Sequence, residues 1–390
     1  MEPRTAEPGD PVEPRRPAPK RAPGTWKIGQ IGGVDVLVRS SWLLVAVVIS
    51  VMMAPAVDQV EPGLGGWKYV AGLAFAVLLY LSVLLHEASH ALMAQRFGLP
   101  VTSITLHFLG GVTEIDGEPD TPGREFAVSV VGPLTSIAVG LVVLPLAVLA
   151  PDSSLLDLAA KGLAGANLVV GVLNLVPGLP LDGGRVLRAA VWKLTGSPHQ
   201  GTVVAGWGGR VAAVLVLAYP FARQFVLGGE PTLTDYVFSF VIASFLWSGA
   251  AASIMSARVR RRLPALRART LARRTLMVPH DLPLAEAVRR AQEEQAGSIV
   301  VLDHVGAPSA IVNEAAVLAT PEDRRPWLPV SAVARGLEPG LSMPADLSGE
   351  ALILAMQKSP ATEYLLLDGD GSIFGVLVTD DVDKAFAAGI

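Results

Sequence analysis

Residues 70–96 read VAGLAFAVLLYLSVLLHEASHALMAQR, and this stretch decides the fold. The run Val70–Leu85 carries no charge, Lys68 can reach outward from its start, and the helix is expected to continue through His86 to Arg96. A helix that spans a bilayer needs roughly 20 apolar residues. We therefore predict one long membrane helix that carries two histidines and a glutamate after its uncharged run.

Further apolar runs surround this one. Hydrophobic residues make up 51% of the 390 residues and charged residues only 17%, whereas a typical soluble domain is about 25% charged. A soluble core of buried helices is the alternative, but so many runs within one part of the chain favour six membrane-spanning helices. The predicted spans are 42–57, 70–85, 126–150, 162–181, 211–222 lengthened by 203–210, and 236–256.

Basic residues predict the orientation of these spans. The N-terminal tail and the segment 258–274 are rich in Arg and Lys, and cytoplasmic flanks carry such an excess. Six spans place both termini on one side, which we expect to be the cytoplasmic side of the cell (inner or plasma) membrane. Arg185, Arg188 and Lys193 follow the fourth run and fall on the same side.

Composition divides the chain into four parts. Residues 1–25 mix prolines with charged residues and are expected to form a disordered cytoplasmic tail rather than a signal peptide. Residues 26–257 form the membrane domain, which opens on a strand-like lead-in at 26–40. A basic linker is expected at 258–270 and a soluble α+β region at 271–388. The net charge of −4 argues against a nucleic-acid partner.

The segment His86-Glu87-Ala88-Ser89-His90 contains the residues best suited to catalysis or metal binding. Positions i and i+4 lie on one face of a helix, so both imidazoles can reach one metal ion while Glu87 lies beside it as a general base. The chain has no cysteine, so metal ligands must be His, Asp or Glu. The alternative is a helix end at the membrane interface, where these side chains face water.

A catalytic zinc takes three protein ligands and keeps one position open, so a third ligand must come from elsewhere. His107, Glu114 and Asp116 are close in sequence, but the best candidate is Asp182 in the segment 174–185, NLVPGLPLDGGR. Prolines interrupt the helix there, and irregular backbone at membrane depth needs protein or a wet cavity around it. A membrane-edge turn with a solvated aspartate is the alternative.

The two motifs together resemble the site-2 protease family of intramembrane metalloproteases. HExxH ends the second run, and N-x-x-P-x-x-P-L-D-G-G ends the fourth. The resemblance implies a zinc ion bound by His86, His90 and Asp182, with Glu87 activating water. It also implies an endopeptidase that cleaves membrane-anchored proteins within or near the bilayer, in regulated intramembrane proteolysis. Both runs cross from outside to inside in the predicted topology, so their ends are expected to meet at one depth.

Further segments fit this resemblance. FLGGVTEI (108–115) is similar to the family's β-hairpin beside the site, and Gly110 and Gly111 are candidates for positioning substrate, since a substrate can add a strand to such an edge. Asn174 either contacts the substrate or an oxyanion, or caps the broken helix. Gly132 is interpreted mainly as a helix-packing residue. The expected partners are single-span membrane proteins, and the resemblance suggests anti-sigma-type regulators.

Residues 271–327 and 328–388 form two weakly similar units, each reading as helix, strand, turn, strand and helix. They resemble a tandem pair of CBS domains, which are cytosolic regulatory modules that often bind adenine nucleotides. Asp381 keeps the position that contacts ribose in that family, but Val378 stands where Thr is expected, and the first unit lacks both residues. An adenine nucleotide at this pair and a purely structural role, including homodimer formation, both stay open.

Three other functions are alternatives. A proteolytically silent membrane-protein-binding protein would have lost Glu87, a metal ligand or the open position. A CBS-regulated transporter or channel would show paired charges in several spans or repeated broken helices. A membrane metalloenzyme acting on lipid or another small substrate is the third. One metal-like cluster and no convincing repeat among the spans favour the peptidase.

Overall fold

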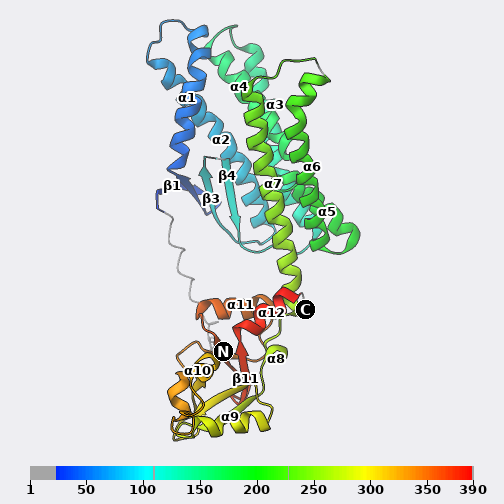
Figure 1. Ribbon diagram of the computed structural model, residues 1–390. Helices are drawn as coiled ribbons and strands as arrows, with labels where there is room; N and C mark the ends of the chain where they lie inside the picture. Colours follow the sequence, from blue (N-terminus) through cyan, green and yellow to red (C-terminus); the bar gives the residue numbers. More distant parts are fainter. Residues whose placement is uncertain (1–22, 109, 227, 389–390) are drawn as a thin grey trace, which may run out of the picture. The chain divides into compact units, whose positions relative to one another are not determined.

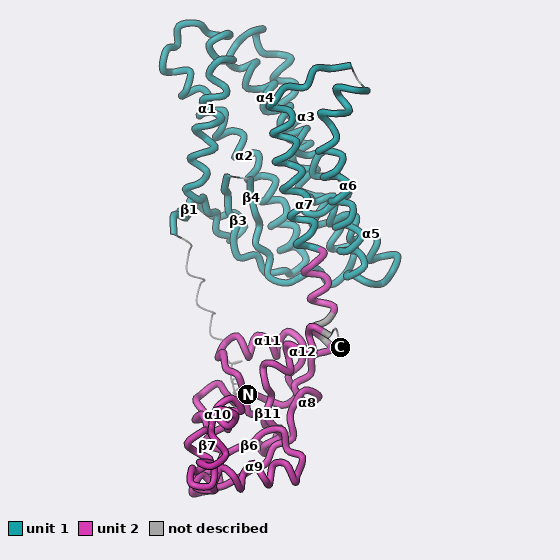
Figure 2. Tube along the Cα trace, in the orientation of Figure 1, with its two compact units in different colours: residues 1–253 teal, residues 254–390 magenta. Residues whose placement is uncertain are grey.

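The computed structural model describes residues 23–108, 110–226 and 228–388. The chain forms two compact units, Met1–Ser253 and Ile254–Ile390, which Figures 1 and 2 show in ribbon and tube form. The tail expected at 1–25 lies outside the described residues, apart from its last three. The two units are described separately below.

Six helices dominate the first unit, and each is long and apolar enough to cross a membrane. This confirms the prediction of a multi-pass α-helical membrane protein. Proline lies inside three of the six, and the chain around it stays helical. The helices are α1 (Ser41–Val60), α2 (Trp67–Arg96), α3 (Pro122–Leu149), α4 (Leu155–Asn174), α6 (Pro198–Phe225) and α7 (Leu233–Arg262).

The interior of this bundle is built from small side chains. Large apolar side chains such as Val142 and Val148 on α3 point outward and are 74% and 77% exposed. Buried positions on the same helix include Ser129, Gly132 and Ser136. Lipid provides no hydrophobic drive for helices to associate, so close contact through small residues and interhelical hydrogen bonds holds them together.

The predicted fourth span, 162–181, is displaced in the structure. Helix α4 begins at Leu155, where the Ser154 side chain accepts a hydrogen bond from the Asp157 amide. Asp157 and Lys161 interrupt the apolar pattern, but they form an i,i+4 ion pair of 2.8 Å and so are accommodated within the helix. The helix ends at Asn174, and 175–181 is irregular before α5 (Asp182–Thr195) begins.

A four-stranded sheet packs against α2. Its order is β1 (Thr25–Ile31), β2 (Val34–Arg39), β3 (Val101–His107) and β4 (Gly110–Ile115). The two hairpins are antiparallel, and β2 pairs with β3 in parallel. A cluster of Val34, Ile104, Ala88 and Ala91 joins the sheet to the second half of α2. The strands expected at 26–40 and 101–115 are therefore present, and they lie beside the HExxH segment.

The second unit repeats one order of elements twice. This order confirms the tandem helix-strand-strand-helix units predicted from the sequence. The first copy contains β5 (Thr275–Pro279), α9 (Leu284–Glu293), β6 (Ser298–Leu302), β7 (Pro308–Val312) and α10 (Glu314–Ala319). The second contains β9 (Ser342–Pro344), α11 (Gly349–Lys358), β10 (Glu363–Leu367), β11 (Ile373–Val378) and α12 (Thr379–Ala388). Short elements complete the unit: η1 (Leu263–Ala265), α8 (Ala268–Leu271), η2 (Val330–Val333) and β8 (Ala334–Gly336).

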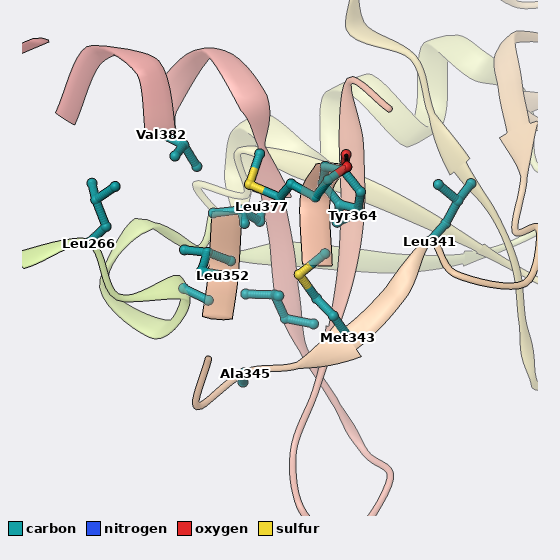
Figure 3. Packing of buried hydrophobic residues seen from close by; sticks show 11 residues of the cluster. Leu266, Leu341, Met343, Ala345, Leu352, Tyr364, Leu377 and Val382 are labelled. Carbon is teal, nitrogen blue, oxygen red and sulfur yellow. Dashed lines mark hydrogen bonds between the residues drawn. The ribbon is translucent and has the colours of Figure 1, made fainter. Parts of the chain in front are cut away.

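The segment expected as a basic linker at 258–270 is not a separate linker, because it forms the end of α7, η1 and most of α8, and its second half packs into the core of this unit. Leu266 and Ala268 have no exposed surface and belong to the same cluster as Leu352, Tyr364 and Leu377. Figure 3 shows this cluster, with side chains from α11, β10 and β11 meeting in one interior. The boundary between the two units instead falls inside α7, after Ser253.

Candidate metal centre

The HExxH histidines lie one turn apart on α2. His86 and His90 are each only 6% exposed, and their ring centroids are 4.9 Å apart. Buried imidazoles in a membrane helix require polar partners. Both rings find theirs on neighbouring elements, and these partners determine which ring nitrogen stays available.

Residues on helix α3 hydrogen-bond to one nitrogen of each ring. His90 Nδ1 donates to the Val128 carbonyl at 2.6 Å, and His86 Nδ1 lies 2.9 Å from Ser136 Oγ. A proton on Nδ1 leaves Nε2 with a free lone pair, which is the form in which histidine binds a metal. The α3 contacts therefore orient both Nε2 atoms toward one point.

Asp182 reaches the same point from the start of α5. The irregular segment before it is held by α6, where Ala205 accepts a hydrogen bond from the Leu179 amide at 2.9 Å. A Cβ on Gly209 would lie 1.8 Å from the Leu179 carbonyl oxygen, so only glycine allows this approach. The Asp182 carboxylate is thereby placed 3.1 Å from His86 Nε2 and 3.3 Å from His90 Nε2.

These three donors fit a tetrahedral zinc site. The two Nε2 atoms are 3.2 Å apart, so the donors form a triangle with sides of 3.1 to 3.3 Å. Tetrahedral bonds of about 2.05 Å require donors about 3.3 Å apart. Among the described residues, this is the one group of three or more such side chains close enough to hold a metal.

The electrostatics of the triangle also suit a cation. Burial opposes ionisation of Asp182, but without a metal the two histidines can carry protons on Nε2, and hydrogen bonds from them hold the pKa of the carboxyl well below its usual range. A metal cation at this point would take the place of those protons. The carboxylate is therefore ionised at neutral pH. Together with two imidazole nitrogens, it forms the hard and borderline donor set that zinc accepts.

Gly132 on α3 forms one wall of the triangle. A Cβ added there would lie 2.1 Å from His90 Nε2 and 2.7 Å from His86 Nε2. The sequence interpretation of Gly132 as a helix-packing residue missed this contact. The glycine keeps open the space that a ligated metal needs.

Glu87 lies beside the triangle rather than in it. Thr113 Oγ1 on β4 donates to Glu87 Oε2 at 2.7 Å. Gly111 on the same strand passes so close that a Cβ there would lie 2.3 Å from Glu87 Cγ. Strand β4 thus fixes one carboxylate oxygen of Glu87, and the carboxylate is not among the three donors.

A cavity of about 580 Å³ surrounds these groups. Its lining includes the three donors, Glu87 and other residues singled out in the sequence, namely His107, Gly110, Gly111 and Asn174. The HExxH segment of α2 and the C-terminal end of α4 therefore line one cavity. Burial, with the charge of Arg39 adding to it, lowers the pKa of His107, so that imidazole is neutral at pH 7.

The other candidate third ligands take different positions. Glu114 accepts a hydrogen bond from Ser103 Oγ at 2.9 Å within the β3–β4 pair. The Asp116 amide donates to the Pro100 carbonyl just after β4. Neither side chain, nor that of His107, joins the donor triangle.

Sequence reasoning missed Glu125, which has no exposed surface although it lies in the first turn of α3. Its Oε1 accepts from Arg185 Nε and Arg188 Nη1 on α5, each at 3.3 Å. Those arginines had served only as evidence for orientation. They bind the helix that carries Asp182 to the helix that orients both histidines. The signal was a lone acid at the start of an apolar run.

Asp381 in the second unit is engaged by Arg273. The guanidinium contacts both carboxylate oxygens, at 2.6 and 3.1 Å, and also reaches Glu314 at 2.9 Å. A cavity of about 210 Å³ lies beside Arg273 and Glu314. Asp381, the candidate ribose contact, therefore joins α12 to the segment just before β5.

The membrane domain is similar to known metalloproteases. Residues 74–162 and 152–218 match peptidase family M50. A putative zinc metalloprotease from Synechocystis is 32% identical over 248 residues, which are 62% of this chain and 63% of that protein. The putative zinc metalloprotease Rip3 of Mycobacterium tuberculosis is 36% identical over 207 residues, 52% of each chain. The chain thus spans between half and two thirds of the length of these relatives.

Two solved structures are also similar to parts of the chain. A site-2 protease from Methanocaldococcus jannaschii is 24% identical, with a TM-score of 0.41, over 59% of this chain and 95% of that one. A conserved CBS domain protein of unknown function from Thermoplasma acidophilum is 15% identical, with a TM-score of 0.26, over 32% of this chain and 74% of that one.

Proposed function

We propose that the chain is a zinc-dependent intramembrane endopeptidase, since residues 74–218 match peptidase family M50, in keeping with the resemblance of its two motifs. One observation carries the proposal. Three donor atoms converge at 3.1 to 3.3 Å inside the membrane domain, and a separate glutamate is held beside them. A binding protein without catalysis has no need for that glutamate.

His86, His90 and Asp182 would hold the metal. When bound, zinc lowers the pKa of water to about 7 and polarises a carbonyl oxygen. Glu87 takes a proton from the attacking water and returns it to the amide nitrogen as the peptide C–N bond breaks. Thr113 holds Oε2 of this glutamate at 2.7 Å and so keeps the carboxylate oriented through both transfers.

The cavity and the sheet edge support a peptide substrate. Strand β4 is the last strand of its sheet, so one edge of it has no strand partner, and Gly110 and Gly111 line the cavity. An extended segment can pair with such an edge. Asn174, at the end of α4, lines the same cavity and supplies an amide for the substrate backbone. The substrates we propose are single-span membrane proteins, including anti-sigma-type regulators.

We also propose that both termini are cytoplasmic and that the protein resides in the cell membrane. Basic residues flank the helix ends that carry the metal centre, because Arg185, Arg188 and Lys193 all lie on α5. The positive-inside rule then places the centre near the cytoplasmic edge. The HExxH motif lies in the C-terminal half of α2, and the second motif follows the end of α4 at Asn174. Both therefore lie toward this side of the membrane domain, which brings the site within reach of water.

For the second unit we propose a regulatory or dimerising role as a CBS pair. Its two copies share an apolar cluster of Val300, Ile311, Leu365 and Val376, which joins the two sheets. Arg273 forms an ion pair with the Asp381 carboxylate, so binding of an adenine nucleotide at Asp381 would require this ion pair to open. Direct titration of the purified chain with ATP and AMP tests that point.

Metal content and cleavage test the main proposal. The purified protein, Glu87→Gln and Asp182→Ala are compared for bound zinc and for cleavage of a model single-span substrate. We expect the unsubstituted chain to hold about one zinc and to cut, Glu87→Gln to keep zinc without cutting, and Asp182→Ala to lose zinc affinity by at least about 100-fold. Zinc binding without cleavage in every form would favour a silent binding protein. Full zinc and activity in Asp182→Ala would refute the ligand assignment.

A further inference from the structure

Helices α6 and α7 form an antiparallel pair with a charged residue in its apolar middle. Ala212 and Ala213 on α6 pack against Ala243 and Leu246 on α7. At one end of the pair Arg223 forms an ion pair of 3.1 Å with Asp235. Arg210 lies further inside, between Gly209 and Val211, and takes no part in the donor triangle or its supports.

No carboxylate pairs with Arg210 among the residues that the structure describes. Its guanidinium lies 4.7 Å from the ring centre of Trp207 and 5.0 Å from that of Trp247. Its Nε is shielded from solvent and makes no hydrogen bond. Two indoles attract a cation, but they supply no negative charge to compensate it. A cation at this depth is costly without an anion nearby, and Arg223 on the same helix has one.

An apolar groove begins beside Trp247. It has a volume of about 330 Å³ and is lined by Ala213, Val214, Leu217, Phe240, Ala243 and Trp247, with Ser244 and Ser248 between them. Ser248 donates to the Ser244 carbonyl at 2.6 Å, so its hydroxyl proton is used within α7. The groove therefore offers a ligand almost only apolar contacts, and its size lies at the lower end of the ligand-site range of roughly 300–1,000 Å³.

The cation and the apolar groove lie one after the other along α6, as the headgroup and acyl chain do in a lipid. Trp207 precedes Arg210 by about one turn, so the guanidinium leans toward the N-terminal end of α6, where His199, Gln200 and Thr202 lie. The groove extends the opposite way, toward Leu217. Arg210 lies eight residues after Thr202, which separates the two along the helix by only about 12 Å. The leaning arginine side chain brings the guanidinium still closer to the N-terminal end of α6.

We propose that this site binds an anionic glycerophospholipid, with its phosphate on Arg210 and one acyl chain in the α6–α7 groove. A phosphate accepts two parallel hydrogen bonds from a guanidinium, and it supplies the negative charge that Arg210 lacks among the described residues. A zwitterionic lipid carries a compensating cation of its own and gains less. The site is independent of the proposed peptidase chemistry.

Brominated lipids test the site directly, because bromine on an acyl chain quenches tryptophan nearby. The full chain is reconstituted in phosphatidylcholine vesicles with a small fraction of brominated phosphatidylglycerol or, in parallel, brominated phosphatidylcholine. Trp247→Phe identifies the signal from the groove. We expect relative association with Trp247 to favour phosphatidylglycerol by roughly tenfold, equal to about 1.4 kcal/mol. Arg210→Gln should abolish this preference, and Arg210→Lys should retain part of it.

Arg223→Gln is the matched control, because it removes the same charge from the same helix at a paired site. It should leave the preference unchanged. Equal quenching by both lipids in the unsubstituted chain overturns the proposal even if Arg210→Gln does not fold. Retention of the preference in a folded Arg210→Gln protein also overturns it, and would make Arg210 only a clamp between two helices. Preferential quenching by a brominated fatty acid alone would replace the phospholipid with a free carboxylate.

Discussion

A methyl group on Gly132 is the sharpest perturbation that the metal centre offers. An ideal Cβ at this position lies 2.1 Å from His90 Nε2, whereas non-bonded heavy atoms settle at about 3.5 Å, so the two must separate by about 1.4 Å. The ring cannot swing away freely, because Val128 holds its other nitrogen at 2.6 Å. Metal–ligand distances tolerate only about 0.2 Å. We therefore expect Gly132→Ala to lower zinc affinity by at least about 100-fold and to abolish cleavage.

Chelator competition on the detergent-solubilised protein measures the zinc affinity, and a model single-span substrate reports cleavage. Gly123→Ala is the matched control, since it adds the same methyl group to α3 at a position with no atom within 4 Å. Overpacking alone should cost about 1–3 kcal/mol of stability, so both variants need a folded-state check. Wild-type zinc affinity in Gly132→Ala would refute the reasoning, because the Nε2 atoms could not then face this glycine.

Three further substitutions separate the parts of the site and the second unit. Gly111→Ala places a Cβ 2.3 Å from Glu87 Cγ, so cleavage should fall at least about 100-fold while bound zinc stays near one per chain by elemental analysis. Glu125→Gln leaves the α5 arginines partly uncompensated, and we expect a loss of about 3 kcal/mol in unfolding free energy together with weaker zinc binding. Hydrogen bonds from Arg273 lower the pKa of Asp381. Their stabilisation is present above the ordinary aspartate pKa of about 3.9 and is lost as pH falls through the lower folded value. Arg273→Gln should therefore destabilise the C-terminal unit by about 1–2 kcal/mol near pH 7 and by progressively less in acid, as measured by thermal unfolding across pH.

The elements that could be predicted are those with a local signal. Long uncharged runs predict the membrane spans, because the length and apolar composition of a segment largely decide whether it can span a bilayer as a helix. HExxH fixes two donors through helix geometry. Asp182 could be singled out because prolines and glycines interrupt an apolar run directly before it. Each inference needs only neighbours along the chain.

The missed features depend on contacts between distant segments. The start of α4 was placed too late, because Asp157 and Lys161 look like the end of a span until their pairing is known. Glu125 directly precedes the predicted span 126–150, and two arginines 60 and 63 residues away make its burial tolerable. Gly132 has the same local sequence whether it faces another helix or a pair of imidazoles. Only tertiary packing distinguishes these cases.

The same contacts hold the helices together and orient the proposed chemistry. In a bundle whose interior is mostly small residues, buried polar side chains supply much of the attraction between helices. Here the rings of α2 bind Ser136 and Val128 on α3, and Glu125 on α3 binds α5. Loss of a member of this network should therefore reduce stability and metal affinity together. Strand β4 holds Glu87 from outside the network, so a change on that strand should remove catalysis while the bundle and its donors persist.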